Sequence, residues 1–287
     1  MVIFRRKKDN DTWHSHTECS NWPTSDYIEP TRYSEHREFG EKCNECGFLY
    51  EFDKQAQDFY DTSPLKNRPH WYVIIRPTTF DDYYIKKDFP TYCKKIDQYS
   101  NNWDVWHYPY VDLEYCKNSS KEDRGFIQSK HEVEGHRQYW RFYRSGLFQH
   151  SLSFIDEARC PGKKIGKNSI IHTTTKIFNF AAMLAQNFNK FIFIKIQMKG
   201  IKEFALYKED VPCPFIGTYS MLKDTEPYKV KIEKQALLND PDQFAREAAV
   251  LFFKHFKVKD MPEEDFINVN NISKEVIKTI QRKCKKI

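Results

Sequence analysis

The sequence predicts an α+β protein, with a small N-terminal module followed by a mixed, largely antiparallel sheet domain with helices. Hydrophobic residues make up 40% of the 287 residues and aromatic residues 16%, which is enough for a buried core. Segments with strand and helix patterns do not alternate regularly, and this argues against a parallel α/β sheet. A polar segment at 61–69, broken by Pro64 and Pro69, separates a first region at 1–60 from a second at 70–287.

The first region is short and rich in polar residues. We expect a strand at 2–5, a loop around 13–22 and a helix through 50–59, where acids and helix-forming residues dominate. About sixty residues seldom bury enough apolar surface to fold alone, so we expect an additional source of stability such as a bound metal ion.

Four residues of this region have the spacing of metal ligands: His14, Cys19, Cys43 and Cys46. The run from Cys43 to Gly47 is the C-x-x-C-G form of a zinc knuckle, in which two thiolates reach one ion. The glycine is expected to permit a tight turn that directs backbone N–H groups at sulfur. His14 and Cys19 would complete a tetrahedral Cys3His site.

The imidazole ligand stays open among three candidates, His14, His16 and His36. Three thiolates and one imidazole fill a tetrahedral Zn2+ site and leave no position for a substrate, so the expected ion is structural. The other five cysteines are widely separated and are expected to be thiols.

The second region contains several segments with clear periodicity. Strands are expected at 71–75, 103–116, 190–199, 204–208 and 228–233. Helices are expected at 89–98, at 174–188 with Thr173 or Thr174 as its cap, from Asp240-Pro241 to His255, and from Ser273 onward with a basic outer face.

The segment at 137–155 is predicted to form a β-hairpin that turns at Ser145-Gly146. A three-residue loop at 145–147 would pair Phe142 with His150 and give one apolar and one largely polar face. The polar face would then carry a row of alternating side chains: Arg137, Tyr139, Arg141 and Tyr143.

This row is the candidate ligand-binding site. Arginine offers paired donors to phosphate or carboxylate, and tyrosine offers a stacking surface to bases. The alternative interpretation is a solvated sheet face on which tyrosine rings shield the arginine stems. His150 falls on the apolar face, where a core histidine is expected rather than a catalytic one.

Charge and hydropathy limit the class of protein. Residues 1–8 contribute +4 and residues 273–287 contribute +5 to a net charge of +6, so the basic residues gather at the two ends. No run of apolar residues is long enough to span a membrane, and residues 1–5 lack the apolar core of a signal peptide. We therefore expect a cytoplasmic protein without a membrane partner.

Two motifs that suggest catalysis do not meet its requirements. His131 and His136 are five residues apart, so on a helix they would not share a face as in a metalloprotease. Gln197-Met198-Lys199 ends a hydrophobic strand as in some nucleases, but no acidic residue lies between Glu157 and Glu203 to bind the metal. No glycine-rich phosphate loop or nucleophile motif is present.

Two stretches resemble known families. The segment from Thr12 to Pro23, together with 40–46, resembles a small zinc-knuckle segment of uncharacterised bacterial proteins. The hairpin at 143–150, followed by a helix capped by threonine, is similar to the C-terminal region of bacterial Schlafen-related, Alba-like ATP-binding proteins. The second resemblance implies a sensor or recognition domain in defence against phage. It carries over no activity, because the ATP-binding domain itself is not visible.

These observations lead to one expectation and two alternatives. We expect a non-catalytic, zinc-containing bacterial recognition or sensor protein that binds a phosphate-rich ligand, with nucleic acid preferred. One alternative is a metal-dependent nuclease, and the other is a scaffold that binds a protein partner. The sequence leaves the oligomeric state open.

Overall fold

The computed structural model describes residues 5–8, 12–15, 19, 21–25, 27–28, 43–81, 85, 91, 94–98, 108–109, 125–133, 136–154, 164–202, 204–207 and 224–256. The chain divides into two compact units, Met1–Asp61 with Thr78–Asp82 and Thr62–Pro77 with Tyr83–Ile287. The boundaries expected from the sequence, 1–60, 61–69 and 70–287, stay a prediction. None of the helices in the described ranges has the length and apolar character needed to cross a membrane.

The first unit contains two short strands and most of one long helix. Strand β1 (Arg6–Lys7) pairs antiparallel with β2 (Tyr27–Ile28), and helix α2 spans Asn44–Thr62. The helix expected at 50–59 is therefore present but begins earlier, directly after Cys43. Of the strand expected at 2–5, residues 2–4 lie outside the described residues.

The second unit is built on a six-stranded sheet in the order β10-β8-β3-β6-β5-β4. Every pairing in this sheet is antiparallel, and helices pack with it, so the predicted α+β class is confirmed. The strands are β3 (His70–Pro77), β4 (Phe126–Val133), β5 (His136–Tyr143), β6 (Phe148–Ser153), β8 (Phe191–Lys199) and β10 (Tyr228–Glu233). A separate parallel pair joins β7 (Lys164–Gly166) to β9 (Ala205–Tyr207).

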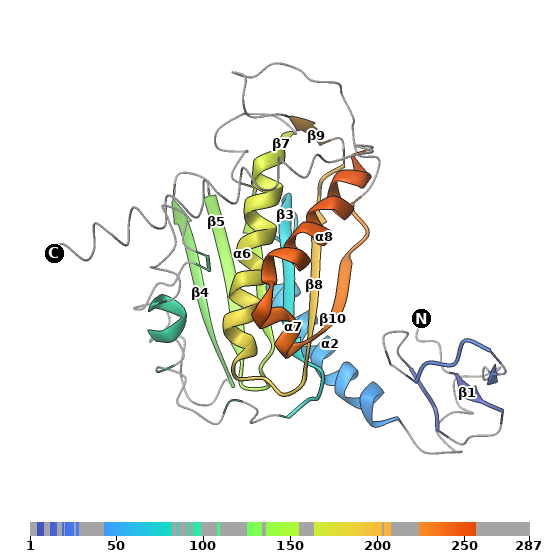
Figure 1. The fold of residues 1–287 in the computed structure, drawn as a ribbon. Helices are drawn as coiled ribbons and strands as arrows, with labels where there is room; N and C mark the ends of the chain where they lie inside the picture. The colour runs from blue at the N-terminus through green and yellow to red at the C-terminus, as the bar shows by residue number, and fades with distance from the viewer. Residues whose placement is uncertain are drawn as a thin grey trace. The chain divides into compact units, whose positions relative to one another are not determined.

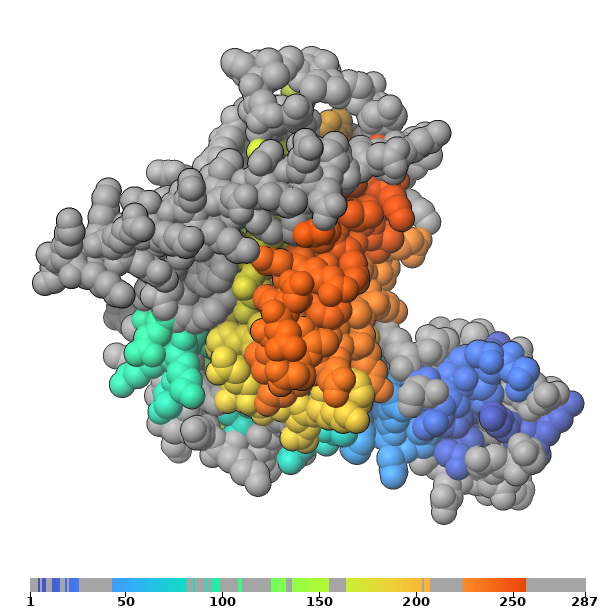
Figure 2. Space-filling model, viewed as in Figure 1, coloured from blue at the N-terminus to red at the C-terminus, as the bar shows by residue number. Residues whose placement is uncertain are grey.

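One face of this sheet forms the core with helices α6 (Lys167–Ala185), α7 (Lys234–Asn239) and α8 (Pro241–His255), which all lie on the same side (Figure 1). Figure 2 shows the side chains of these helices as a continuous layer on that side. Strand β8 illustrates the pattern, because Ile192, Ile194, Ile196 and Met198 are fully buried while the alternate residues are partly exposed. Alternation of this kind is typical of a strand with two different faces.

Helix α6 begins seven residues before the expected start at 174. Thr174 is therefore not a cap: its hydroxyl donates to the carbonyls of Ile170 and Ile171, at 3.0 and 2.9 Å. A threonine whose hydroxyl donates to carbonyls of the preceding turn can lie in the interior of a helix. Thr174 therefore did not mark the N-terminus of α6. The N-cap is Gly166, which offers no side-chain hydrogen bond.

Helix α8 starts as the sequence predicts. The Asp240 side chain accepts a hydrogen bond from the Gln243 backbone N–H at 3.0 Å, and Pro241 occupies the first turn. Both features are expected at a helix N-terminus. The segment 103–116, apart from residues 108–109, and the helix expected from 273 lie outside the described residues.

The hairpin of β5 and β6 has the predicted faces but a different register. Phe142 pairs with Phe148 rather than with His150, and the loop covers residues 144–146. Gly146, with φ of 83°, takes the last loop position, where the left-handed backbone of a three-residue hairpin loop belongs. The predicted loop at 145–147 would have placed Leu147 there. A shift of two residues preserves both faces of the strands, so the pattern alone could not detect it.

The Gly146→Ala variant should be less stable than Gly125→Ala. Both residues have positive φ, 83° and 67°, so each new Cβ should cost about 1–2 kcal/mol. The Cβ at residue 146 would in addition lie 3.1 Å from the Pro77 Cδ and 3.3 Å from the Phe188 Cε1, whereas residue 125 has no atom within 4 Å. Urea unfolding of the two variants measures the difference, and equal stabilities would contradict the close approach.

Candidate metal centre and the predicted ligand-binding row

The four predicted metal ligands meet in the first unit. His14, Cys19, Cys43 and Cys46 are all buried, and their ligand atoms lie within 4.8 Å of one another. The cluster is a candidate metal centre, the single such group of histidine, cysteine and acidic residues found in the described part of the chain. Of the three candidate imidazoles, His14 takes part, while His16 and His36 lie outside the described residues.

Backbone contacts from separate segments hold these ligands in place. The His14 and Arg5 backbones form a β-bridge, with N–H···O distances of 2.9 and 2.8 Å. The Cys43 N–H donates to the Trp13 carbonyl at 3.0 Å, which connects the start of α2 to the His14 segment. Cys46 lies in the first turn of α2, where the N-terminal end of the helix dipole favours a thiolate.

The spacing of the ligand atoms fits a tetrahedral site. Bonds of about 2.3 Å to sulfur and about 2.0 Å to nitrogen require S···S edges of roughly 3.8 Å and S···N edges of roughly 3.5 Å. The Cys19 and Cys43 sulfurs lie 3.6 Å apart, and the His14 Nδ1 lies 3.4 and 4.0 Å from the sulfurs of Cys19 and Cys46. A disulfide would need an S–S distance of about 2.05 Å, so these are separate thiols.

The environment of the thiols calls for a cation. Burial raises the pKa of the Cys19 thiol, and the neighbouring Cys43 and Cys46 raise it further against a lowering by the Asn21 backbone. Three buried thiols at contact distance can become thiolates together only if a positive charge lies between them. The Ser15 N–H points at the Cys46 sulfur at 3.3 Å, a contact that supports a thiolate ligand.

Gly47 does not form the expected tight turn beside the cysteines. Gly47 lies inside α2, does not have a positive φ, and has no atom within 4 Å of a Cβ position. The N–H group at the Cys46 sulfur comes from Ser15, thirty-one residues away in the chain. This long-range contact has no sequence signal, because it depends on how the two segments meet.

The predicted ligand-binding row does lie on one face of β5, but most of it is buried. The exposed fractions of Tyr139, Arg141 and Tyr143 are 5%, 4% and 5%. Arg141 donates to the hydroxyls of Tyr139 at 2.7 Å, Tyr143 at 3.2 Å and Thr62 at 3.0 Å. Its guanidinium also donates to Gln128 at 3.2 Å and lies 4.1 Å from the centre of the Phe126 ring.

Charge at Arg141 is stabilised by these contacts. Burial alone would lower the pKa of Arg141, but its interactions with the Tyr143 and Tyr139 hydroxyls raise it. Arg141 therefore forms an internal hydrogen-bonded network with Tyr139, Tyr143, Gln128 and Thr62. We call it the Arg141 network. In this arrangement the network stabilises the fold and offers little surface to a ligand.

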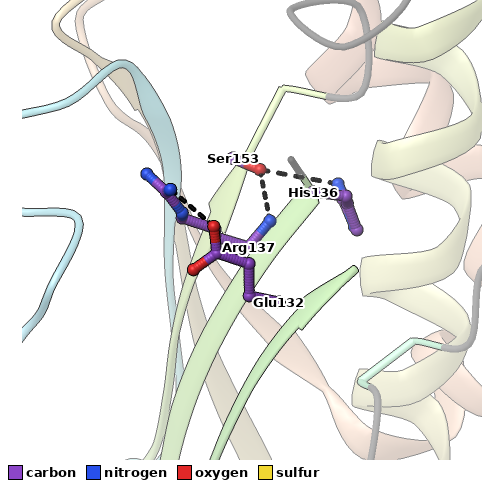
Figure 3. Close-up of polar contacts among 4 residues, drawn as sticks. All are labelled: Glu132, His136, Arg137 and Ser153. Carbon is purple, nitrogen blue, oxygen red and sulfur yellow. Dashed lines mark hydrogen bonds and ion pairs between the residues drawn. The ribbon is translucent and has the colours of Figure 1, made fainter. Parts of the chain in front are cut away.

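Arg137, the fourth member of the row, is partly exposed and is held from two sides (Figure 3). Its guanidinium forms an ion pair with Glu132, the residue opposite it on β4. Its backbone N–H donates to the Ser153 Oγ at 2.7 Å. His136 leaves the same strand in the other direction, toward α6, with its Nδ1 3.5 Å from Ser153.

His136 and His150, on the helix side of the sheet, are buried and neutral. Burial lowers the pKa of His136 to about 4, helped by Lys176 and His131, and burial lowers the pKa of His150 to about 3, helped by His136. Neither ring nitrogen of His150 has a hydrogen-bond partner among the described residues, and the ring packs against Tyr108 and Phe148. His131 and His136 lie on neighbouring strands, so the metalloprotease arrangement on one helix does not occur.

No family model, no curated protein and no solved structure matches this chain. The resemblances to zinc-knuckle segments and to Schlafen-related proteins therefore stay predictions.

Replacing a cluster cysteine should remove the bound metal. Purified protein should contain close to one equivalent of metal, and Cys43→Ser should contain much less and melt at a lower temperature, because metal binding contributes directly to folding. Metal content by mass spectrometry together with thermal unfolding measures both effects. Cys284→Ser, outside the cluster, is the matched control, and equal metal content in the two variants would contradict the site.

Replacing Arg141 should destabilise the protein far more than replacing Arg137. Arg141→Met leaves buried hydroxyl and amide groups without their donor, which should cost about 2–4 kcal/mol. Arg137→Ala breaks a partly exposed ion pair whose contribution is about 0–1 kcal/mol. Chemical unfolding compares the two variants, and similar losses would show that the row is not divided into a buried network and an exposed end.

Proposed function

We propose that this protein is a non-catalytic recognition protein in which structural Zn2+ holds a basic, aromatic surface that binds nucleic acid. The observation that carries the proposal is the β-bridge between His14 and Arg5. One residue of the candidate metal centre is thereby paired with Arg5, a cation that directly precedes strand β1. Metal binding and presentation of this strand are then parts of one local structure.

Zinc is the ion that best fits the donors. Three thiolates and one imidazole are soft and borderline ligands, and their distances suit tetrahedral coordination. All four positions would be filled by protein, so Zn2+ would stabilise the fold and leave no position at which to activate water or substrate.

The surface beside this centre has the chemistry of a phosphate and base contact. Lys7 and Lys8 are exposed, and the Arg5 guanidinium lies 5.1 Å from the centre of the Trp22 ring. Trp22 is partly exposed and packs on the thiol cluster. Cations attract phosphate oxygens, and an aromatic ring stacks on an unpaired base, so this combination favours nucleic acid over a neutral ligand.

The nuclease alternative gains no support from the nuclease-like triplet. In the described residues, the Gln197 amide donates to the Thr225 carbonyl at 2.9 Å, and the Lys199 ammonium lies 4.5 Å from the centre of the Tyr72 ring. No second group of metal-ligating residues accompanies them within the described ranges. The scaffold alternative, a cytoplasmic location and a role in phage defence stay predictions.

Direct binding measurements test this proposal. Fluorescence anisotropy with labelled single- and double-stranded DNA and RNA should give affinities that fall as salt rises, because bound phosphates release counterions. Lys7→Ala/Lys8→Ala should lower the slope of log K against log salt by about 1.4 on single strands. Lys54→Ala/Lys254→Ala, which removes two charges from exposed helix positions, is the matched control.

Two results would overturn the proposal. If the zinc-loaded protein binds none of the four nucleic acids at low salt, it is not a nucleic-acid-recognition protein. If the signal decays with time only when Mg2+ is added, the protein is a nuclease. A chelator that removes zinc should weaken binding, since Arg5 and the adjoining strand β1 with Lys7 lose their link to the metal centre.

A further inference from the structure

A second basic and aromatic surface lies on the face of β8 and β10 opposite to helices α6, α7 and α8. Every second residue of each strand belongs to this face, and those of β8 lie opposite those of β10. Lys231 is opposite Phe193, and Lys229 is opposite Lys195. We call it the β8–β10 face and define it by six residues: Phe191, Phe193, Lys195, Lys199, Lys229 and Lys231.

Positive charge dominates this face. Lys229 and Lys231 are exposed, while Lys195 and Lys199 are partly exposed on the next strand. Burial lowers the pKa of Lys199, and Lys195 lowers it further, while Asp224 acts in the opposite direction. Glu233 is the exposed acid at the far end of β10. Among the described residues of β8 and β10 on this face, four lysines accompany one acid, Glu233, which lies opposite Phe191.

Aromatic rings lie between these cations. The ammonium groups of Lys190 and Lys231 each lie 5.3 Å from the centre of the Phe191 ring. The Arg76 guanidinium lies 4.1 Å from the centre of the Phe193 ring, which holds that ring from the neighbouring strand β3. Phe191 and Phe193 keep part of their surface exposed. Each ring is therefore flanked by positive charge and still accessible.

Protection of the sheet edge explains only half of this arrangement. Lysines on an edge strand discourage pairing with another chain, and β10 is the edge. That function does not require Lys195 and Lys199 one strand further in, nor partly exposed phenylalanines. Lys229 also lies directly opposite Lys195, an arrangement that suits a ligand with several negative charges.

We propose that the β8–β10 face binds single-stranded nucleic acid, with phosphates on the lysines and bases on Phe191 and Phe193. The proposal rests on the proposed function and assigns it a second contact surface. Charge complementarity selects a polyanion, and the accessible rings select one with unpaired bases. A duplex hides its base faces in the stack, whereas a single strand can place them on aromatic residues of a sheet.

Two variants test the two parts of the contact. Lys229→Gln/Lys231→Gln should weaken binding of a labelled single-stranded oligonucleotide about 10-fold at physiological salt and lower the salt slope by about 1.4. Phe191→Leu should weaken binding roughly 5-fold or more, because leucine keeps apolar contact but offers no stacking face. Phe191→Tyr should retain binding, and Lys54→Gln/Lys254→Gln controls for net charge.

The outcomes separate this inference from the proposed function. If the wild-type protein binds single strands and both test variants bind equally well, with melting temperatures unchanged, the β8–β10 face is not a contact surface while the proposed function stands. If the lysine variant and its charge-matched control lose the same affinity, net charge alone explains the effect and the assigned face is wrong. If the wild-type protein binds no nucleic acid, the proposed function itself fails.

Discussion

The second unit depends on the pairing of β3 with two neighbours at once. Along its length β3 pairs with β6 on one side and β8 on the other, and all eight of its residues are buried. A strand buried on both faces must be apolar or have its polar groups satisfied, which fixes its position at the centre of a sheet. The wings β6-β5-β4 and β10-β8 extend from it in opposite directions, so their side chains belong to one continuous pair of faces.

On the sheet face opposite to α6, α7 and α8, arginine and lysine side chains lie in different environments. On β5, Arg141 finds hydroxyl and amide acceptors within reach and becomes part of the interior. On β8 and β10, Lys199 and Lys231 approach aromatic rings, and Lys229 and Lys231 are exposed. Arginine can satisfy several acceptors from one rigid plane, while lysine is a point charge on a flexible stem. The buried position of Arg141 and the exposed positions of Lys229 and Lys231 thus agree with the chemistry of each side chain.

Signals that act within a few residues were predictive, whereas contacts between distant segments, apart from the meeting of His14 and Cys19 with Cys43 and Cys46, left no pattern in the sequence. The Asp240-Pro241 helix start and the C-x-x-C pair could be read locally, because capping and ligation need fixed short spacings. Alternation assigned the faces of β5 but could not exclude a shift of two residues. The contact between Arg141 and Thr62 joins residues 79 apart in the chain. The local Arg-Tyr-Arg-Tyr pattern therefore could not reveal that Arg141 is buried.

The two proposals assign one nucleic-acid contact surface to each unit of the chain. The proposed surface beside the candidate metal centre consists of Arg5, Lys7 and Trp22, and the β8–β10 face has lysines beside Phe191 and Phe193. Each of these surfaces is formed by residues of a single unit, the first by Met1–Asp61 and the second by Thr62–Pro77 with Tyr83–Ile287. Removing Zn2+ would then lower affinity through one surface alone and leave the other intact. The dependence of affinity on metal would therefore be partial, which distinguishes two linked surfaces from a single site built around the ion.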